Sequence, residues 1–213
     1  MTVTFTIDAN EVPWPVGLSF VGQYMGTNAR CFDLISKFLK EYPAITTIVE
    51  IGTLEGAMTL YLSLWADRLG VPMHTFDIEP EVSRDVHHVF AKREIVTHWV
   101  DAFSREGLRQ VAECFKDGPG LIFMDGGDKN REFATIAPLL PTGSLIAVHD
   151  WGTEFTRIDG GIAKLYYRGD EWMKNEARLA MLRKIGNAED MTQQMSEREI
   201  AAIKRRWIEL VGH

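Results

Sequence analysis

The sequence predicts an α/β fold: a Rossmann-like, doubly wound and mostly parallel sheet with helices on both faces. Three observations predict it. Apolar runs of strand length alternate with helical apolar periods from about residue 28 to residue 150. A turn with two glycines directly follows the first apolar run, and ionisable residues follow nearly every run. A strand–helix succession of this kind gives parallel strands whose carboxyl ends share one edge of the sheet.

The helices are indicated by apolar residues that recur every three or four positions. In the segment 28–42, Phe32 and Ile35 share one helical face, and Pro43 closes the helix. Residues 57–69 are apolar nearly all round, which is typical of a helix packed between a sheet and another element. The same spacing predicts three further helices, which lie around 82–90, 108–115 and 133–137.

Five strands are expected between these helices, and the first, ITTIVEI, is rich in β-branched residues. The strands are expected at 45–51, 72–78, 94–100, 120–125 and 143–150. Ligands of such sheets bind beyond the carboxyl ends of the strands. Ionisable side chains stand in phase at those ends, namely Glu50, Asp77, Asp101, Asp125, His149 and Asp150. A binding site at this edge explains that pattern better than five separate solvated loops.

The last third of the chain has a weaker pattern. Residues 151–169 predict a long loop, and a helix is expected around 171–185. The stretch RLAMLRKI inside that second segment also fits a late strand. A final amphipathic helix is expected from Ile200 to Leu210. No clear final pair of antiparallel strands follows Trp151, so the sheet is expected to be altered or truncated at this side.

Length and composition bound the class of protein. The 213 residues suit one domain over residues 1–213, with a core at about 28–152. The flanking segments 1–27 and 153–213 are expected to face substrate or to form a homo-oligomer. With 23 basic and 30 acidic residues the net charge is −7, which makes nucleic acid an improbable partner.

The cellular setting is expected to be the cytoplasm. The chain has no run of about 18 apolar residues that would span a membrane, and its start lacks the pattern of a signal peptide. Both cysteines, Cys31 and Cys114, lie among apolar neighbours in helix-like segments. They are therefore expected to be reduced thiols. A membrane partner is not expected.

The turn EIGTLEG at residues 50–56 points to a nucleoside ligand. Gly52 and Gly56 allow the backbone to turn sharply and to approach a ligand closely. Asp77, 21 residues after Gly56, stands where an acidic group can hold both ribose hydroxyls. Glu50 would repel a pyrophosphate but attract the ammonium and sulfonium of S-adenosylmethionine. The turn therefore favours S-adenosylmethionine over NAD. The alternative that this glycine turn has only a structural role and binds no ligand stays open.

Five segments, in this order and spacing, resemble the class I S-adenosylmethionine-dependent methyltransferases: EIGTLEG, FDIEPE, DAFS, IFMDGGDKNRE and LLPTGSLIAVHDW. The resemblance covers about residues 20–152. It is closest to the branch of cephalosporin hydroxylase-like proteins and macrocin-type, metal-dependent sugar O-methyltransferases. Catechol O-methyltransferase resembles this branch in its general mechanism. It implies cofactor contacts at Glu50, Gly52, Thr53 and Gly56 for the methionine part, Asp77 for the ribose, and Asp101, Ala102 and Phe103 for the adenine.

The resemblance also implies a divalent metal held by Asp125, His149 and Asp150. Oxygen ligands suit magnesium, and His149 would also admit manganese, iron or zinc. Related sequences often carry a histidine three residues after the first ligand, where this chain has Asp128. The candidates for a general base are therefore Asp128, Lys129 as its rival, and His149 if the site holds no metal.

These observations predict an enzyme that transfers a methyl group from S-adenosylmethionine to a hydroxyl of a small molecule, of sugar or natural-product type. Five aromatic residues are candidates for an acceptor pocket, namely Trp14, Tyr24, Trp151, Tyr166 and Tyr167. Two alternatives stay open: an iron-dependent hydroxylase-type oxidoreductase, and a non-catalytic S-adenosylmethionine-binding protein. Oxygen consumption would identify the hydroxylase, and metal-dependent turnover would separate the enzyme from the binder.

Overall fold

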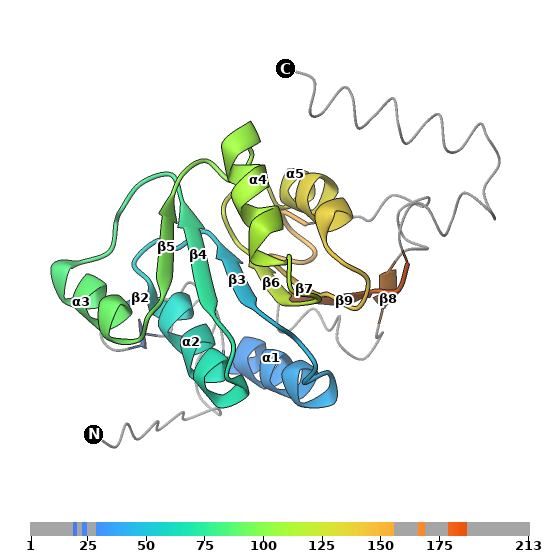
Figure 1. Ribbon diagram of the computed structural model, residues 1–213, viewed down its shortest axis with the longest axis horizontal. Coiled ribbons are helices and arrows are strands. Elements are labelled where there is room, and N and C mark those ends of the chain that lie inside the picture. Colours follow the sequence, from blue (N-terminus) through green and yellow to red (C-terminus); the bar gives the residue numbers. More distant parts are fainter. Residues whose placement is uncertain (1–18, 21–22, 25–28, 156–165, 169–178, 187–213) are drawn as a thin grey trace.

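The computed structural model describes residues 19–20, 23–24, 29–155, 166–168 and 179–186, to which all structural statements refer. A seven-stranded sheet runs through the centre, in the order β5-β4-β3-β6-β7-β9-β8 (Figure 1). In chain order its strands are β3 (Ile48–Ile51), β4 (Met73–Asp77), β5 (Val96–Trp99), β6 (Leu121–Met124), β7 (Leu145–His149), β8 (Tyr166–Arg168) and β9 (Leu179–Lys184). A separate antiparallel pair, β1 (Ser19–Phe20) with β2 (Gln23–Tyr24), lies near the N-terminus.

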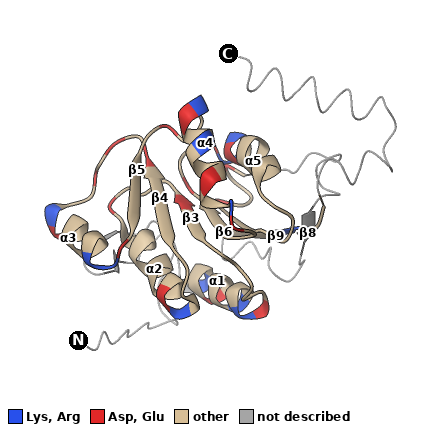
Figure 2. Cartoon of the chain, in the orientation of Figure 1, with Lys and Arg blue, Asp and Glu red and all other residues tan. Residues whose placement is uncertain are grey.

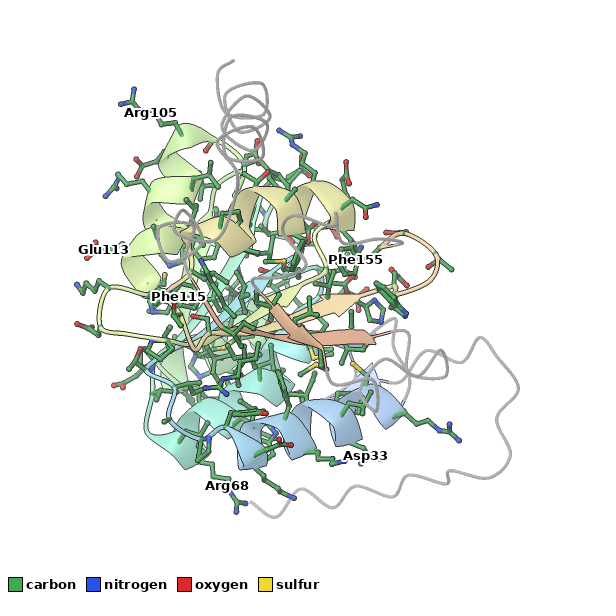
Figure 3. All side chains as sticks on the ribbon, turned by 90° about the vertical axis from the view of Figure 1, so that its right-hand side faces the viewer. Asp33, Arg68, Arg105, Glu113, Phe115 and Phe155 are labelled. Carbon is green, nitrogen blue, oxygen red and sulfur yellow. The ribbon has the colours of Figure 1, made fainter. Side chains whose placement is uncertain are left out.

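Helices cover both faces of the sheet (Figures 1 and 3). One layer contains α1 (Ala29–Glu41), α2 (Ala57–Leu69) and α3 (Arg84–Lys92). The other contains α4 (Arg105–Cys114) and α5 (Lys129–Ile136), which continues into a short 3-10 helix, η1 (Ala137–Leu139). The predicted fold class is confirmed, as are the five helices and five strands predicted up to residue 150.

The sheet separates two hydrophobic cores because successive side chains of a strand point to opposite faces. In β6, Leu121 and Phe123 pack with α1 and α2, whereas Ile122 and Met124 pack with α4 and α5. All four side chains are buried. Burial on both faces explains why these strands appear in the sequence as continuous apolar runs without alternation.

The C-terminal side of the sheet corrects the sequence prediction. The helix expected around 171–185 is wrong for residues 179–184, which form β9 antiparallel to β7. The alternative that RLAMLRKI forms a late strand is confirmed. The strand β8 pairs antiparallel with β9, inside the segment expected to be a loop. The sheet is therefore complete at seven strands and not truncated.

Some expectations concern residues outside the described part of the chain. Trp14 and the helix expected from Ile200 to Leu210 belong to this group. Within the described residues, none of the helices has the length and apolar character needed to cross a membrane. Neither cysteine is in a disulfide: Cys31 is buried and Cys114 is partly exposed.

Candidate functional site

The turn after β3 depends on glycine. Gly52 and Gly56 have φ values of 93° and 86°, a region that side chains with a Cβ rarely adopt. A Cβ on Gly52 would stand 2.5 Å from the carbonyl oxygen of Asp125, so the turn lies directly against the end of β6. A Cβ on Gly56 would stand 2.6 Å from the ring of Phe90. Both glycines are therefore required by backbone conformation and by close packing.

Asp77 at the end of β4 fastens this turn. Its Oδ2 accepts hydrogen bonds from the backbone N–H groups of Thr53 at 2.8 Å and Leu54 at 2.9 Å. Its Oδ1 accepts from the N–H of Ile78 at 2.7 Å. Asp77 thus holds the ends of β3 and β4 together, and its carboxylate also faces the cavity described next.

A cavity of about 380 Å³ opens at the carboxyl edge of the sheet, which lies within the usual range for small-molecule sites of about 300–1,000 Å³. It lies at the end of β3, where the strand order reverses: β4 and β5 lie on one side of β3, and β6 and β7 on the other. Sheets of this kind bind ligands at that position. Its lining consists of Gly52, Thr53, Leu54, Ala57, Met58, Asp77, Ile78, Glu79, Glu81, Asp125, Gly126, His149 and Asp150.

The lining is strongly acidic. It contains five carboxyl groups and neither lysine nor arginine. Three of the five, Asp77, Glu79 and Glu81, belong to the end of β4 and the loop that follows it, whose acidic residues are red in Figure 2. A cleft lined by one sign of charge raises the local concentration of oppositely charged ligands. This cavity therefore favours a cationic ligand over one with a pyrophosphate.

The predicted metal ligands come together in the lining of the same cavity. Nδ1 of His149 lies 3.3 Å from Oδ1 of Asp125 and 3.4 Å from Oδ2 of Asp150. One ligand atom from each of the three residues lies within 4.8 Å of the other two. Asp150 has a φ of 57°, so a left-handed backbone turns its carboxylate back toward β6.

Lys129, the first residue of α5, contributes a cation to the same cluster. Its side chain is 6% exposed, and Nζ lies 3.0 Å from Asp125, 3.7 Å from Asp150 and 3.0 Å from Glu154. Burial disfavours the charged amine, but the carboxylates of Asp125 and Glu154 outweigh it and raise the pKa of Lys129. Lys129 does not line the cavity, and these ion pairs favour its ammonium form, which argues against a role as general base.

The same carboxylates act on His149. Burial alone would lower its pKa, but hydrogen bonds to Asp125 and Asp150 and their charges raise the pKa to about 9. Asp128, the other predicted base, is exposed and caps α5 by accepting a 3.0 Å hydrogen bond from the N–H of Arg131. Asp128 does not line the cavity. Of the three predicted bases, only His149 faces it.

Glu50 lies behind the cavity wall. It is fully buried and does not line the cavity, which corrects the expectation that it faces the cationic end of a cofactor. Its Oε2 accepts hydrogen bonds from the hydroxyls of Thr59 and, at 2.6 Å, Thr75, whereas Oε1 has no partner among the described residues. Burial raises the pKa of Glu50 to about 8, so this carboxyl is protonated at neutral pH.

This burial gives a testable dependence of stability on pH. The folded protein binds the Glu50 proton more tightly than the unfolded chain, so Glu50 should lower the stability as pH rises from about 4.5 to about 8. Glu50→Gln removes this slope, which has a maximum of about 1.4 kcal/mol per pH unit. Urea unfolding at pH 5, 6.5 and 8 measures it. The exposed control Glu41→Gln should keep the wild-type slope; a parallel slope in Glu50→Gln would contradict this explanation.

The residues expected to border an adenine lie outside the cavity lining. Asp101 is exposed and accepts a 2.8 Å hydrogen bond from the N–H of Phe103, while Ala102 is buried. The ring of Phe103 packs beneath the guanidinium of Arg131 at 4.6 Å. Their contact with a cofactor stays a prediction. Among the aromatic candidates, Trp151 packs against Phe155, and the side chains of Tyr24, Tyr166 and Tyr167 are not described.

Sequence reasoning missed two acidic residues of the site. Glu154 pairs with Lys129 from the turn after β7, and nothing in its sequence context marks it. Glu132 is fully buried on α5, beneath Gly126, and burial raises its pKa to about 7. Glu132 could have been found from the sequence, because it lies one helical turn beyond Asp128 on the apolar side of a predicted helix.

Comparisons with known proteins agree with this geometry. Residues 49–151 match a family described as a methyltransferase domain. No curated protein sequence matches the chain.

Among solved structures, an apo form of CmcI has a TM-score of 0.60 at 14% identity, covering 87% of this chain and 90% of that one. A CmcI structure described as Mg-SAM has a TM-score of 0.62 at 14% identity, with coverages of 86% and 89%. A third, described with SAH, has a TM-score of 0.58 at 15% identity, with coverages of 87% and 98%. At these identities the likeness establishes the fold. Residues 49–151 thus match a methyltransferase-domain model, and the chain shares the Rossmann-like fold of the CmcI structures.

Proposed function

We propose that this protein transfers the methyl group of S-adenosylmethionine to a hydroxyl of a small molecule in the cytoplasm, assisted by a divalent cation. One observation carries the proposal. The glycine turn with Asp77 and the cluster of Asp125, His149 and Asp150 line the same cavity. A methyl donor and an acceptor bound there would be neighbours.

The acidic lining supports S-adenosylmethionine as the donor. Its sulfonium and ammonium are attracted by the carboxylates, whereas the pyrophosphate of NAD would be repelled. The solved CmcI structures described with SAM and SAH support the same choice. The turn at Gly52 would leave room for the methionine part, and Asp77 would accept hydrogen bonds from the ribose hydroxyls.

The donor set supports a divalent cation. Two carboxylates and an imidazole meet within 4.8 Å, and the described structure already balances the carboxylates with the ammonium of Lys129. Lys129 also pairs with Glu154. This carboxylate can still neutralise the ammonium of Lys129 when a metal ion binds to Asp125 and Asp150. Asp125, His149 and Asp150 would hold the ion. When bound, it would orient the acceptor oxygen and lower the pKa of its hydroxyl.

The remaining steps belong to residues of the chain. Methyl transfer from a sulfonium is an in-line displacement, so the acceptor oxygen must lose its proton while it faces the methyl carbon. His149 would take that proton only in a site without metal, because the ion would otherwise occupy the imidazole. Asp125 and Asp150 raise its pKa to about 9, so its neutral, basic form would require alkaline pH. Lys129 would add positive charge beside the developing alkoxide.

The donor site is tested by Asp77→Ala. This change removes a carboxylate that also fixes the N–H groups of Thr53 and Leu54, so affinity for S-adenosylhomocysteine should fall by one to a few kcal/mol, or roughly 10- to 100-fold. Calorimetry measures it, with the exposed control Asp85→Ala expected to bind like wild type. Tighter binding of NADH than of S-adenosylhomocysteine to the wild-type protein would contradict the proposed donor.

The reaction itself is tested by incubation with labelled S-adenosylmethionine, magnesium and a panel of sugars, catechols and other hydroxylated small molecules. Label transferred to a hydroxyl, with S-adenosylhomocysteine as the second product, is the expected result. Binding of the donor without turnover on any acceptor would favour the non-catalytic alternative. Oxygen consumption coupled to hydroxylation would favour the iron-dependent one.

A further inference from the structure

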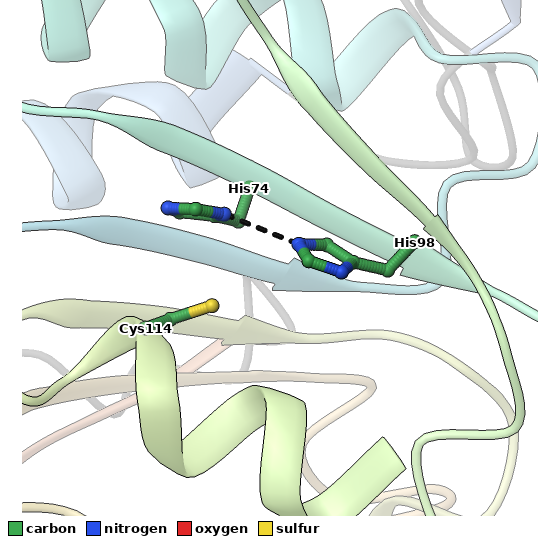
Figure 4. Close-up of side chains that lie close together, drawn as sticks. All are labelled: His74, His98 and Cys114. Atoms are coloured by element: carbon green, nitrogen blue, oxygen red, sulfur yellow. Dashed lines mark hydrogen bonds between the residues drawn. The ribbon is translucent and has the colours of Figure 1, made fainter. Parts of the chain in front are cut away.

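A second cluster of metal-ligand side chains lies outside the methyl-transfer cavity. His74 on β4, His98 on the edge strand β5 and Cys114 at the end of α4 bring their ligand atoms within 4.8 Å of one another (Figure 4). None of the three lines the cavity. His74 stands three residues before Asp77 on the same strand, so its side chain projects from the opposite face of the sheet.

We propose that His74, His98 and Cys114 form a binding site for a zinc-like transition metal ion. Two imidazoles and one thiolate are the ligands that borderline and soft cations prefer, and the trio contains no carboxylate that would favour magnesium or calcium. All three side chains are partly exposed, so an ion can enter and a fourth position stays open for water. Nothing in the methyl-transfer chemistry needs these residues.

The distance between the imidazoles fits a shared ion. Nδ1 of His74 lies 3.2 Å from Nε2 of His98. Two nitrogen ligands of tetrahedral zinc, each about 2.0–2.1 Å from the metal, are about 3.3 Å apart. The pair therefore already has the spacing of two ligands, and the Cys114 sulfur lies within 4.8 Å of a ring nitrogen of each histidine.

A chain of hydrogen bonds determines which nitrogen of His98 is free. Glu106 accepts from Arg109, and hydrogen bonds from Arg109 and Gln110 hold its pKa at about 2, so its carboxylate can only accept. The Gln110 amide must then offer its NH₂ group to Glu106, at 2.7 Å, and its Oε1 to His98. Oε1 accepts from Nδ1–H of His98 at 2.9 Å, which leaves the lone pair of Nε2 directed at His74.

Such an arrangement is typical of the surroundings of metal-binding histidines, which donate their second N–H to an amide, carbonyl or carboxylate. The ring of His98 is also held from below, stacked on Phe76 with 4.1 Å between ring centroids and 4° between planes. Burial lowers the pKa of both histidines, that of His74 to about 4, so both imidazoles are neutral at physiological pH. Their lone pairs are available without loss of a proton to solvent.

Binding requires two proton movements. Without metal, His74 donates its Nδ1–H to His98, so His74 must carry its proton on Nε2 when Nδ1 binds the ion. The Cys114 thiol now donates to the backbone carbonyl of Gln110 at 3.2 Å, and the metal replaces its proton, which is released to solvent. The ion would join β4, β5 and α4, and so fasten the edge strand of the sheet.

Cobalt(II) is the probe of choice, because a thiolate ligand gives it a charge-transfer absorption that nitrogen and oxygen ligands do not. The chain has two cysteines, so this absorption has one alternative source, the fully buried Cys31. We expect one equivalent of Co²⁺ to produce the band in the reduced, metal-free, full-length protein. Zn²⁺ should abolish it by displacement, and excess Mg²⁺ should leave it unchanged.

Variants decide the assignment. Cys114→Ser should lose the band, Cys31→Ser should keep it, and Gln110→Leu should weaken Co²⁺ binding by roughly 10- to 100-fold by freeing the His98 ring. Unchanged binding of S-adenosylhomocysteine checks the fold of each variant, and His98→Gln replaces Cys114→Ser if that variant does not fold. Absence of the band in the wild-type protein, or its persistence in Cys114→Ser, would overturn the proposal.

Discussion

Replacing Gly52 by alanine is expected to abolish binding of S-adenosylmethionine, with affinity reduced by roughly 100-fold or more. The added Cβ would lie 2.5 Å from the carbonyl oxygen of Asp125 and 2.9 Å from the Cα of Gly126. Both contacts are with backbone, which cannot rotate away, so β3 and β6 must separate at the cavity. Left-handed strain adds about 1–2 kcal/mol and overpacking about 1–3 kcal/mol to the loss of stability.

Gly70→Ala is the matched control. Gly70 also has a left-handed backbone, with a φ of 68°, but a Cβ there would meet no atom within 4 Å. It should lose about 1–2 kcal/mol of stability through left-handed strain alone and bind the cofactor normally. Calorimetry with S-adenosylhomocysteine, together with thermal unfolding, compares the two variants. Wild-type affinity in Gly52→Ala would show that the turn does not touch the cofactor.

The position of the site could be predicted from the sequence. The strands and helices up to residue 150 have local sequence signals. The continuous apolar runs predict β3 and β6, and the amphipathic period predicts α1. That parallel strands end at one edge then follows from topology alone. The convergence of Asp77, Asp125, His149 and Asp150 on one cavity could therefore be predicted without coordinates.

The strand β9 shows where local reasoning fails. Its sequence LAMLRK consists of residues with high helix propensity, so the sequence leaves both a helix and a late strand open for this stretch. Pairing with β7 overrides this preference, because Leu179 and Met181 fill one core while Ala180 and Leu182 fill the other. Lys184, on the same face of β9 as Ala180 and Leu182, also donates to the carbonyls of Pro138 and Leu140. Such long-range contacts leave no periodic signal.

The chemistry of the site was predicted less well than its position. Asp128 and Lys129 are adjacent, and the sequence cannot tell which faces the cavity cluster. The start of α5 decides it: the carboxylate of Asp128 caps the helix, and the ammonium of Lys129 turns inward to three carboxylates. A capping residue before a helix is a recognisable pattern, and it argues against Asp128 as a base. For Glu50, the sequence marks its place beside the turn but not its burial.

Removal of divalent metal is expected to lower turnover by roughly 100-fold or more, since a bound ion contributes several kcal/mol to stabilising charge in such reactions. Affinity for S-adenosylmethionine should change little in the same chelator, because the sulfonium needs no metal. Adding back Mg²⁺ or Mn²⁺ should restore turnover. Parallel assays of methyl transfer and of cofactor binding, with and without chelator, measure both quantities on one preparation.

Asp150→Asn is the matched variant, since asparagine also tolerates the left-handed backbone at this position, where φ is 57°. It removes one anionic ligand, so it should weaken metal binding and raise the Mg²⁺ concentration needed for half-maximal turnover. The exposed control Asp117→Asn should behave like wild type. Full turnover in chelator would contradict the metal role. Lys129, 3.0 Å from Asp125, would then be the built-in cation of the site, and His149 would be the base without metal.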